Sequence, residues 1–261
     1  INQLVAQNVA GIAIATNDAD ALQPALTEAM DAGIKVISLD SAVNKDSRHT
    51  HIQQADPEKI GRGLIQAAYE MVDGNGGIAV LSATAQATNQ NLWIEWMKKE
   101  LEENPEKYAN TPLVKVAYGD DDPTKSTSET QAQALLTDSS IKVIIAPTTV
   151  GMLAAGKVLQ DKQSDVKLTG LGLPSEMAPF IEDGTCPWMY LWNPVDIGYL
   201  SGYTMDALVK GTITGDVGGS FNAGDLGEKK ITEAADGGTE VMLGDPFKFD
   251  TENIAEWKEV Y

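Results

Sequence analysis

The stretch Val80–Leu101, "VLSATAQATNQNLWIEWMKKEL", passes from an apolar strand into an amphipathic helix. Four side chains with hydroxyl or amide groups lie between the two, in Thr88, Asn89, Gln90 and Asn91. A turn alone would favour glycine, proline or aspartate, so this concentration of amides indicates a further task. Because an amide donates and accepts hydrogen bonds at once, the stretch predicts contacts with the hydroxyl groups of a small ligand.

Apolar strands alternate with amphipathic helices on both sides of this stretch. The pattern predicts strands over residues 11–16, 35–39, 49–53, 77–82, 113–118, 141–146 and 166–170. A continuous apolar strand such as "KVIIA", residues 142–146, is typical of a parallel sheet that helices cover on both faces. Strands separated by helices favour right-handed crossovers, so we predict an α/β fold with doubly wound, Rossmann-like sheets.

Glycines interrupt the series of strands at "VDGNGG", residues 72–77, which we interpret as a crossing or hinge between two lobes. After Gly211 the pattern changes, and "KKITEAADGGTEVML", residues 229–243, predicts a small hairpin. The last stretch, residues 245–261, predicts a helix capped by Asp250 or Thr251. At the other end, "INQLVAQNV" has helical spacing without a preceding cap, so we expect the chain to begin inside a helix.

Composition disfavours several classes of partner. The net charge of −19, from 19 basic and 38 acidic residues, repels nucleic acid and anionic lipid. No apolar run is long enough to insert into a membrane. Cys186 is the only cysteine, so an internal disulfide and a thiol-rich metal site are excluded. His49 and His51 share one face of a predicted strand, but no third ligand is suggested nearby and we predict no metal site.

Six of the seven predicted strands end in a polar or turn-forming cluster. These clusters are "TND" (16–18), "LDS" (39–41), "SATAQATNQN" (82–91), "YGDDD" (118–122), "APTT" (146–149) and "GLGLPSE" (170–176). Ligands of open α/β sheets bind beyond the carboxyl ends of the strands. If two such sheets face each other across a cleft, Asp40 would lie opposite Asn89 and Gln90. Carboxylate and amide groups together suit a neutral ligand rich in hydroxyl groups.

Purely structural interpretations stay open for some of these residues. Asn89 and Asn91 are also suitable caps for the helix that follows, and Trp93 is expected to pack inside rather than touch ligand. "DDDPTKS", residues 120–126, is interpreted as the start of a helix with Asp122 or Thr124 as its cap. The usual signatures of dinucleotide binding, phosphate binding and serine hydrolysis are missing, so we predict neither an enzyme nor a cofactor.

Several blocks taken together resemble the type I solute-binding proteins of bacterial ABC transporters. They are "LSATAQATNQNLWIEWMKK", "YGDDDPTKS", "IIAPTTVGMLAA", "TGLGLPSEM" and "LWNPVDIGY". The similarity is to the rhamnose-binding group and to the autoinducer-2-binding (LsrB-like) group, and it spans nearly the whole chain. The resemblance implies two Rossmann-like lobes, over residues 1–73 with 192–240 and over 76–188 with 241–261. It also implies that an N-terminal strand–helix–strand precedes residue 1 in the family.

The same resemblance implies where the ligand binds. The autoinducer-2 receptors place an aspartate at Asp40 and an aspartate–glutamine pair at Asn89 and Gln90. Backbone groups of Pro147 and Thr149 are implied as further contacts. The "TNQN" form is closer to the rhamnose-binding group, because Asn89 replaces a carboxylate that only accepts hydrogen bonds. Three residues at other strand ends complete the predicted site: Asn17, Trp192 and Asn193. Trp192 would stack on the apolar face of a sugar ring.

The resemblance therefore implies an extracytoplasmic receptor, periplasmic or lipid-anchored on the cell surface, that closes on a sugar or on autoinducer-2. Its partner would be a membrane permease, and the receptor is expected to act as a monomer. Two other interpretations share the fold. An effector-binding domain of a transcription regulator would have a helix-turn-helix ahead of residue 1, and a sugar-modifying enzyme would release a product.

Overall fold

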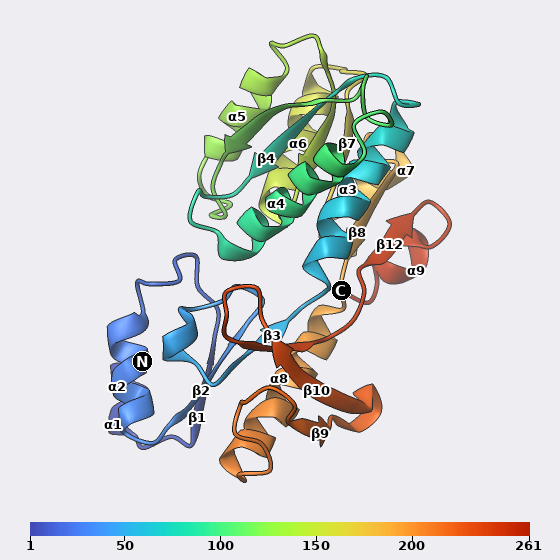
Figure 1. Cartoon of the computed structure of the whole chain (residues 1–261). Helices are drawn as coiled ribbons and strands as arrows, with labels where there is room; N and C mark the ends of the chain where they lie inside the picture. Colours follow the sequence, from blue (N-terminus) through green and yellow to red (C-terminus); the bar gives the residue numbers. More distant parts are fainter. The chain divides into compact units, whose positions relative to one another are not determined.

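The computed structural model describes residues 1–261 and divides the chain into two compact units, each with a sheet of its own (Figure 1). Unit 1 contains Ile1–Asp56, Gln86–Asn89 and Trp192–Asp245. Unit 2 contains Pro57–Ala85, Gln90–Leu191 and Pro246–Tyr261.

Unit 1 is built on a mixed six-stranded sheet in the order β1-β2-β3-β11-β10-β9. The first strands are parallel: β1 (Gly11–Ile14), β2 (Lys35–Leu39) and β3 (Thr50–Gln53). Next to β3 lies an antiparallel hairpin of β10 (Glu228–Glu233) and β11 (Thr239–Met242). The strand β9 (Ser220–Asn222) pairs with β10 and forms the edge of the sheet. Because β11 runs parallel to β3, the hairpin extends the sheet rather than standing apart from it.

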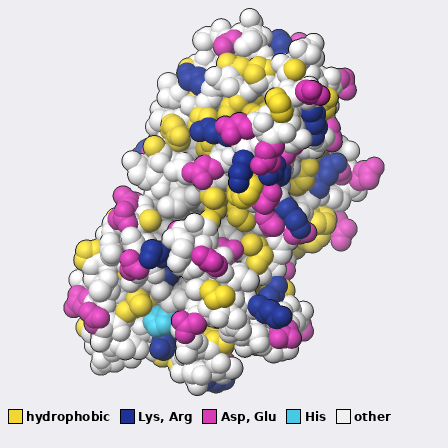
Figure 2. All heavy atoms as spheres, viewed as in Figure 1, with side chains coloured by type: hydrophobic (Ala, Val, Ile, Leu, Met, Phe, Trp, Pro, Cys, Tyr) yellow, Lys and Arg dark blue, Asp and Glu magenta, His cyan; other side chains and the backbone are white.

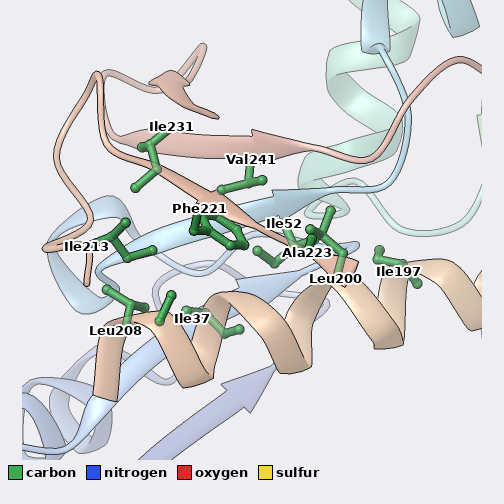
Figure 3. Close-up of a cluster of buried hydrophobic side chains, with 11 residues drawn as sticks. Ile37, Ile52, Ile197, Leu200, Leu208, Ile213, Phe221, Ala223, Ile231 and Val241 are labelled. Atoms are coloured by element: carbon green, nitrogen blue, oxygen red, sulfur yellow. The ribbon is translucent and has the colours of Figure 1, made fainter. Parts of the chain in front are cut away.

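Helices cover both faces of this sheet. On one face α8 (Pro194–Val209) packs Leu200 and Leu208 against Ile37, Ile52 and Val241 of the strands (Figure 3). On the opposite face α2 (Gln23–Asp31) buries Leu26 against Ile12 and Val36, and α1 (Asn2–Ala6) lies beside it. Val36 and Ile37 are neighbours in β2, so alternation sends their side chains into the two different cores. Two short 3₁₀ turns, η1 (Lys45–Ser47) and η2 (Gly224–Leu226), complete the unit.

Unit 2 has a fully parallel sheet in the order β5-β4-β6-β7. Its strands are β4 (Gly77–Ser82), β5 (Leu113–Tyr118), β6 (Ile141–Ala146) and β7 (Lys167–Gly170). A second, antiparallel pair joins β8 (Trp188–Leu191) to β12 (Phe247–Asp250). The helices are α3 (Pro57–Met71), most of α4 (Thr88–Glu103), α5 (Thr127–Leu135), α6 (Thr149–Asp161), α7 (Pro174–Glu182) and α9 (Ile254–Trp257). Every residue of β4 is buried, as its continuous apolar sequence predicted.

The series of strands predicted from the sequence is confirmed. The bounds of β2, β4, β5 and β6 match the prediction, and those of β1, β3 and β7 differ by one or two residues. The hairpin predicted over 229–243 is present as β10 and β11. The predicted helix near Asp250 is wrong in its start. Residues 247–250 form the strand β12 instead, because Phe247 and Phe249 alternate with polar residues and the segment pairs with β8. The helix α9 begins only at Ile254 and has no side-chain cap.

The glycine-rich stretch at 72–77 does not lie where the chain passes between the units. It forms the turn from α3 to β4 inside unit 2, where Gly74 has φ +71° and Gly76 has φ +156°. The first passage from unit 1 to unit 2 lies at Asp56–Pro57 instead. The reason is that α3 packs against β6 and β7, so this helix belongs with the sheet that comes after it.

The surface carries charges of both signs. Figure 2 shows acidic side chains spread over the face in view, with lysines and arginines between them. No helix is both long enough and apolar enough to span a bilayer.

Candidate functional site

Polar side chains gather at the carboxyl ends of the strands in both units. In unit 1 they follow β1, β2 and β3, and in unit 2 they follow β4, β5 and β6. The carboxyl ends of parallel strands form one edge of a sheet, which is where α/β proteins hold small ligands.

Asp40 follows β2 in an unusual backbone conformation. Its φ is +60°, in the left-handed region, and its N–H donates a hydrogen bond to Ile52 O at 3.2 Å. That bond fixes Asp40 beside the end of β3. A residue other than glycine in this region costs about 1–3 kcal/mol, and aspartate is among the residues that tolerate it. Strain of this kind is typical of residues that a fold holds ready for a ligand.

Gln54, directly after β3, is a residue that the sequence analysis missed. Its side chain is 0 % exposed, and neither Oε1 nor Nε2 has a hydrogen-bond partner. Its neighbour Gln53 is also buried but donates from Nε2 to Ala55 O at 3.2 Å. The signal was present in the sequence, because "HIQQAD" puts two amides at the end of a predicted strand, the same feature that singled out Asn89 and Gln90.

The other predicted residues of unit 1 lie in different surroundings. Asn17 is exposed in the bend after β1. Asn193 is the N-cap of α8, and its Oδ1 accepts hydrogen bonds from Val195 N at 2.9 Å and Asp196 N at 3.3 Å. Its oxygen therefore holds the helix start, and its Nδ2 is the end of the side chain that can donate to a ligand. Trp192, half-buried, directly precedes this cap.

Gln90 is the best-defined predicted residue in unit 2. It is 3 % exposed, and its Oε1 accepts hydrogen bonds from Ser82 Oγ and from Ala83 N, both at 2.9 Å. A backbone N–H can only donate, so the orientation of the amide is determined: Oε1 faces the end of β4, and Nε2 is the end that can donate to a ligand. Asn89 precedes it, half-buried, in the first turn of α4.

Asn91 donates from Nδ2 to Ala85 O at 2.8 Å. It therefore tethers the loop that precedes α4. The prediction of Asn89 or Asn91 as the helix cap is wrong, because α4 begins at Thr88 and both asparagines lie inside it.

Pro147 and Thr149 connect β6 to α6. Pro147 is buried directly after the strand, and Thr149 is the first residue of the helix. Thr149 Oγ1 accepts a hydrogen bond from Leu173 N at 3.2 Å, which ties this turn to the segment after β7. The N-cap Thr148 makes no side-chain cap; its Oγ1 donates to Asp121 at 2.5 Å. The first backbone N–H groups of α6 lie at the carboxyl edge of the unit 2 sheet, and the side chain of Thr148 does not accept hydrogen bonds from them.

The acidic stretch after β5 folds on itself. Asp120 accepts a hydrogen bond from Lys125 Nζ at 2.9 Å, which lowers the pKa of this half-buried carboxyl. Asp122 accepts from Thr124 Oγ1 at 2.6 Å. The N-cap of α5 is Ser126, so the prediction of Asp122 or Thr124 as the cap is wrong by two residues or more. Asp122 instead closes the turn that leads to the helix.

The two histidines are bound within the unit 1 sheet. His51 Nδ1 lies 2.9 Å from Ser38 Oγ, and His49 Nδ1 accepts from Val36 N at 3.2 Å. Burial lowers the pKa of His51 to about 3. No group of three or more His, Cys, Asp or Glu side chains is arranged to hold a metal ion.

Residues 1–213, most of the chain and both strand edges described above, match the periplasmic binding protein domain. The chain belongs to this family. Among solved structures, this binding protein is similar to an ABC transporter solute-binding protein from Clostridium phytofermentas with bound L-rhamnose. The two are 52% identical with a TM-score of 0.93, and the match covers 100% of this chain and 83% of that one.

Two further structures extend the comparison. A sugar ABC transporter protein from Actinomyces odontolyticus is 40% identical, with a TM-score of 0.76 and coverage of 98% of this chain and 81% of that one. LsrB from Clostridium saccharobutylicum, in complex with AI-2, is 22% identical, with a TM-score of 0.88 and coverage of 98% and 84%. At 22% identity, the similarity to LsrB supports a shared fold only. The expected fold and the expected class, a solute-binding protein of an ABC transporter, are confirmed.

Proposed function

We propose that this binding protein captures a small neutral sugar, with L-rhamnose or a similar deoxy sugar favoured, for import by an ABC transporter. The observation that carries the proposal is the 52% identity, over the whole of this chain, to a solute-binding protein with bound L-rhamnose. The chemistry of the predicted residues agrees with it, because amides and a carboxylate suit hydroxyl groups rather than a charged ligand.

The proposed contacts come from both units. Asp40 would accept from sugar hydroxyls, and Gln90 would donate from its Nε2. Pro147 and Thr149 would add contacts from unit 2. Unit 1 would add contacts from Asn17, Asn89, Trp192 and Asn193. A hinge motion would close the units on the sugar, and the closed form would be favoured by its greater affinity for ligand.

The proposal also covers the setting of the protein. Members of this family are extracytoplasmic. We expect this one in the periplasm or anchored to the cell surface, acting as a monomer and delivering its ligand to a membrane permease. The task is binding rather than catalysis, so the sugar would be released unchanged.

A thermal-shift screen tests the proposal. L-rhamnose, other deoxy sugars, pentoses and autoinducer-2 are added in turn, and a ligand at a hundred times its Kd raises stability by about 2.7 kcal/mol. The expected result is a large rise with L-rhamnose or a related deoxy sugar, confirmed by calorimetry. A rise with autoinducer-2 and none with any sugar would replace the proposed ligand. Chromatography of the recovered sugar shows whether it is unchanged, and a product would indicate an enzyme.

A further inference from the structure

Gln54 is a buried amide with no hydrogen bond. Its side chain is 0 % exposed, and both Oε1 and Nε2 are without partners. Each buried polar group left in this state costs about 1–3 kcal/mol, and the large majority of buried side-chain polar atoms in proteins are paired. An amide that a fold buries at this cost calls for a partner outside the chain's own hydrogen bonds.

The position of Gln54 places it at the ligand-binding edge of the unit 1 sheet. Leu243 N donates to Gln53 O at 2.9 Å, so the pairing of β3 with the β11 side continues to the end of the strand. Gln54 follows Gln53 directly, in the bend at the carboxyl end of the strand. Asp40, the strained residue after β2, donates its N–H to Ile52 O at 3.2 Å, so both residues lie at the same carboxyl edge.

A packing role alone does not account for this amide. Gln53 shows what a structural glutamine looks like here, because it is buried to a similar extent and its Nε2 donates to Ala55 O. If Gln54 only filled space, a methionine or leucine would fill it without two unpaired polar groups.

We propose that Gln54 is a further ligand-binding residue, which forms hydrogen bonds with two adjacent hydroxyl groups of the sugar. The amide has an acceptor and a donor side by side, so Oε1 can accept from one hydroxyl while Nε2 donates to its neighbour. The inference rests on the proposed function, and it adds a preference for sugars with a vicinal diol. A sugar lacking one of the two hydroxyls leaves half of the buried amide unpaired again.

The test compares Gln54→Met with Gln53→Met, two apolar replacements of adjacent buried glutamines. Calorimetry measures the affinity of each variant and of the unmodified protein for L-rhamnose and for its monodeoxy analogues. Melting temperatures without ligand are measured in parallel. Gln54→Leu serves as a second apolar variant if the methionine does not fit.

For Gln54→Met we expect an affinity for L-rhamnose at least tenfold weaker and a ligand-free melting temperature unchanged or higher. The analogues lacking either of the two hydroxyls should lose less affinity in this variant than in the unmodified protein. Gln53→Met should show the reverse, a lower melting temperature with affinity unchanged. If the unmodified protein binds L-rhamnose and Gln54→Met and Gln54→Leu bind it within twofold as well, the inference is overturned alone. If the unmodified protein binds no sugar, the proposed function fails and the inference fails with it.

Discussion

Ser82 Oγ donates a hydrogen bond to Gln90 Oε1 at 2.9 Å, and Ala83 N donates a second to the same oxygen at the same distance. The last residue of β4 and the one after it thus orient a side chain on α4. The amide of Gln90 is held before any ligand arrives, which lowers the entropy that binding would otherwise cost.

Gln90→Ala should weaken sugar binding by about tenfold to a hundredfold, which corresponds to one lost hydrogen bond of about 1–3 kcal/mol. Stability should fall as well, since Ser82 Oγ and Ala83 N lose their shared acceptor. Ser82→Ala removes only one of the two bonds to Gln90 and should cost less affinity. Gln160→Ala is a control of the same size on the surface, where Gln160 pairs with Asp183. Calorimetry showing full affinity in Gln90→Ala would reject this residue as a ligand contact.

Asp40 allows its backbone and its carboxylate to be tested separately. Asp40→Asn keeps a side chain that tolerates φ +60° but loses the charge, so we expect a normal melting temperature with affinity at least tenfold weaker. Asp40→Gly should also lose affinity while its stability stays equal or rises by about 1 kcal/mol, because glycine relieves the strain. Asp40→Val should lose both. Equal affinity in Asp40→Asn and the unmodified protein would show that the carboxylate does not touch the sugar.

The strands of this protein could be predicted because their apolar runs are short, β-branched and separated by turn residues. The crossing between the units could not be predicted in the same way. The glycines at 72–77 are a strong local signal, but a glycine at positive φ ends a helix as readily as it forms a hinge. What decides the boundary is the packing of α3 on β6 and β7, strands that lie about seventy residues or more further along the chain.

The residues of the candidate site could also be predicted only in part from the sequence. Amides and carboxylates at strand ends indicate Asp40, Asn89 and Gln90 as site residues. Gln54 cannot be recognised in this way, because "QQ" in the sequence does not reveal which of two adjacent amides has its hydrogen bonds satisfied. Only the hydrogen bond from Gln53 to Ala55 O separates the two. The cap formed by Asn193 was also hidden, since the same asparagine suits a helix start and a sugar hydroxyl.

Arg48 and Asp236 form an ion pair that joins distant parts of unit 1. Nη2 of Arg48 lies 2.9 Å and 2.7 Å from the two carboxylate oxygens, Nη1 donates to Val43 O, and the arginine side chain is only 2 % exposed. Burial alone would raise the pKa of Asp236, but the N–H of Gly238 and the charge of Arg48 hold it below its ordinary value.

Asp236→Ala should therefore lower the free energy of unfolding by about 1–3 kcal/mol, because it leaves the charge of Arg48 buried without its carboxylate. This range is below that of a fully buried pair, since Asp236 itself is partly exposed. Asp206→Ala is the matched control, because Asp206 pairs with Lys210 on the surface of α8 and should cost about 0.5 kcal/mol or less. Urea denaturation measures both, and equal effects would contradict a stabilising role for the buried pair.

Glu240 gives unit 1 a dependence on pH. The pKa of Glu240 is raised from 4.5 to about 7, mainly by burial and also by the charges of Asp236 and Asp56, while the charge of Arg48 opposes the rise. The folded protein thus holds this proton more tightly than the unfolded chain does. The stabilisation is fully present below about pH 4.5 and is lost as the pH rises through 7.

Glu240→Gln keeps the shape of the neutral acid and removes its titration. We expect this variant to melt at a higher temperature than the unmodified protein at pH 8, and at nearly the same temperature at pH 4.5. His51 contributes with the opposite sign, because its pKa, lowered by burial to about 3, makes stability fall as the pH drops from 6.5 towards 3. That contribution is present in both proteins, so the difference between their melting temperatures at each pH isolates Glu240. A difference that stays constant from pH 4.5 to 8 would mean that Glu240 titrates alike in the folded and unfolded chain.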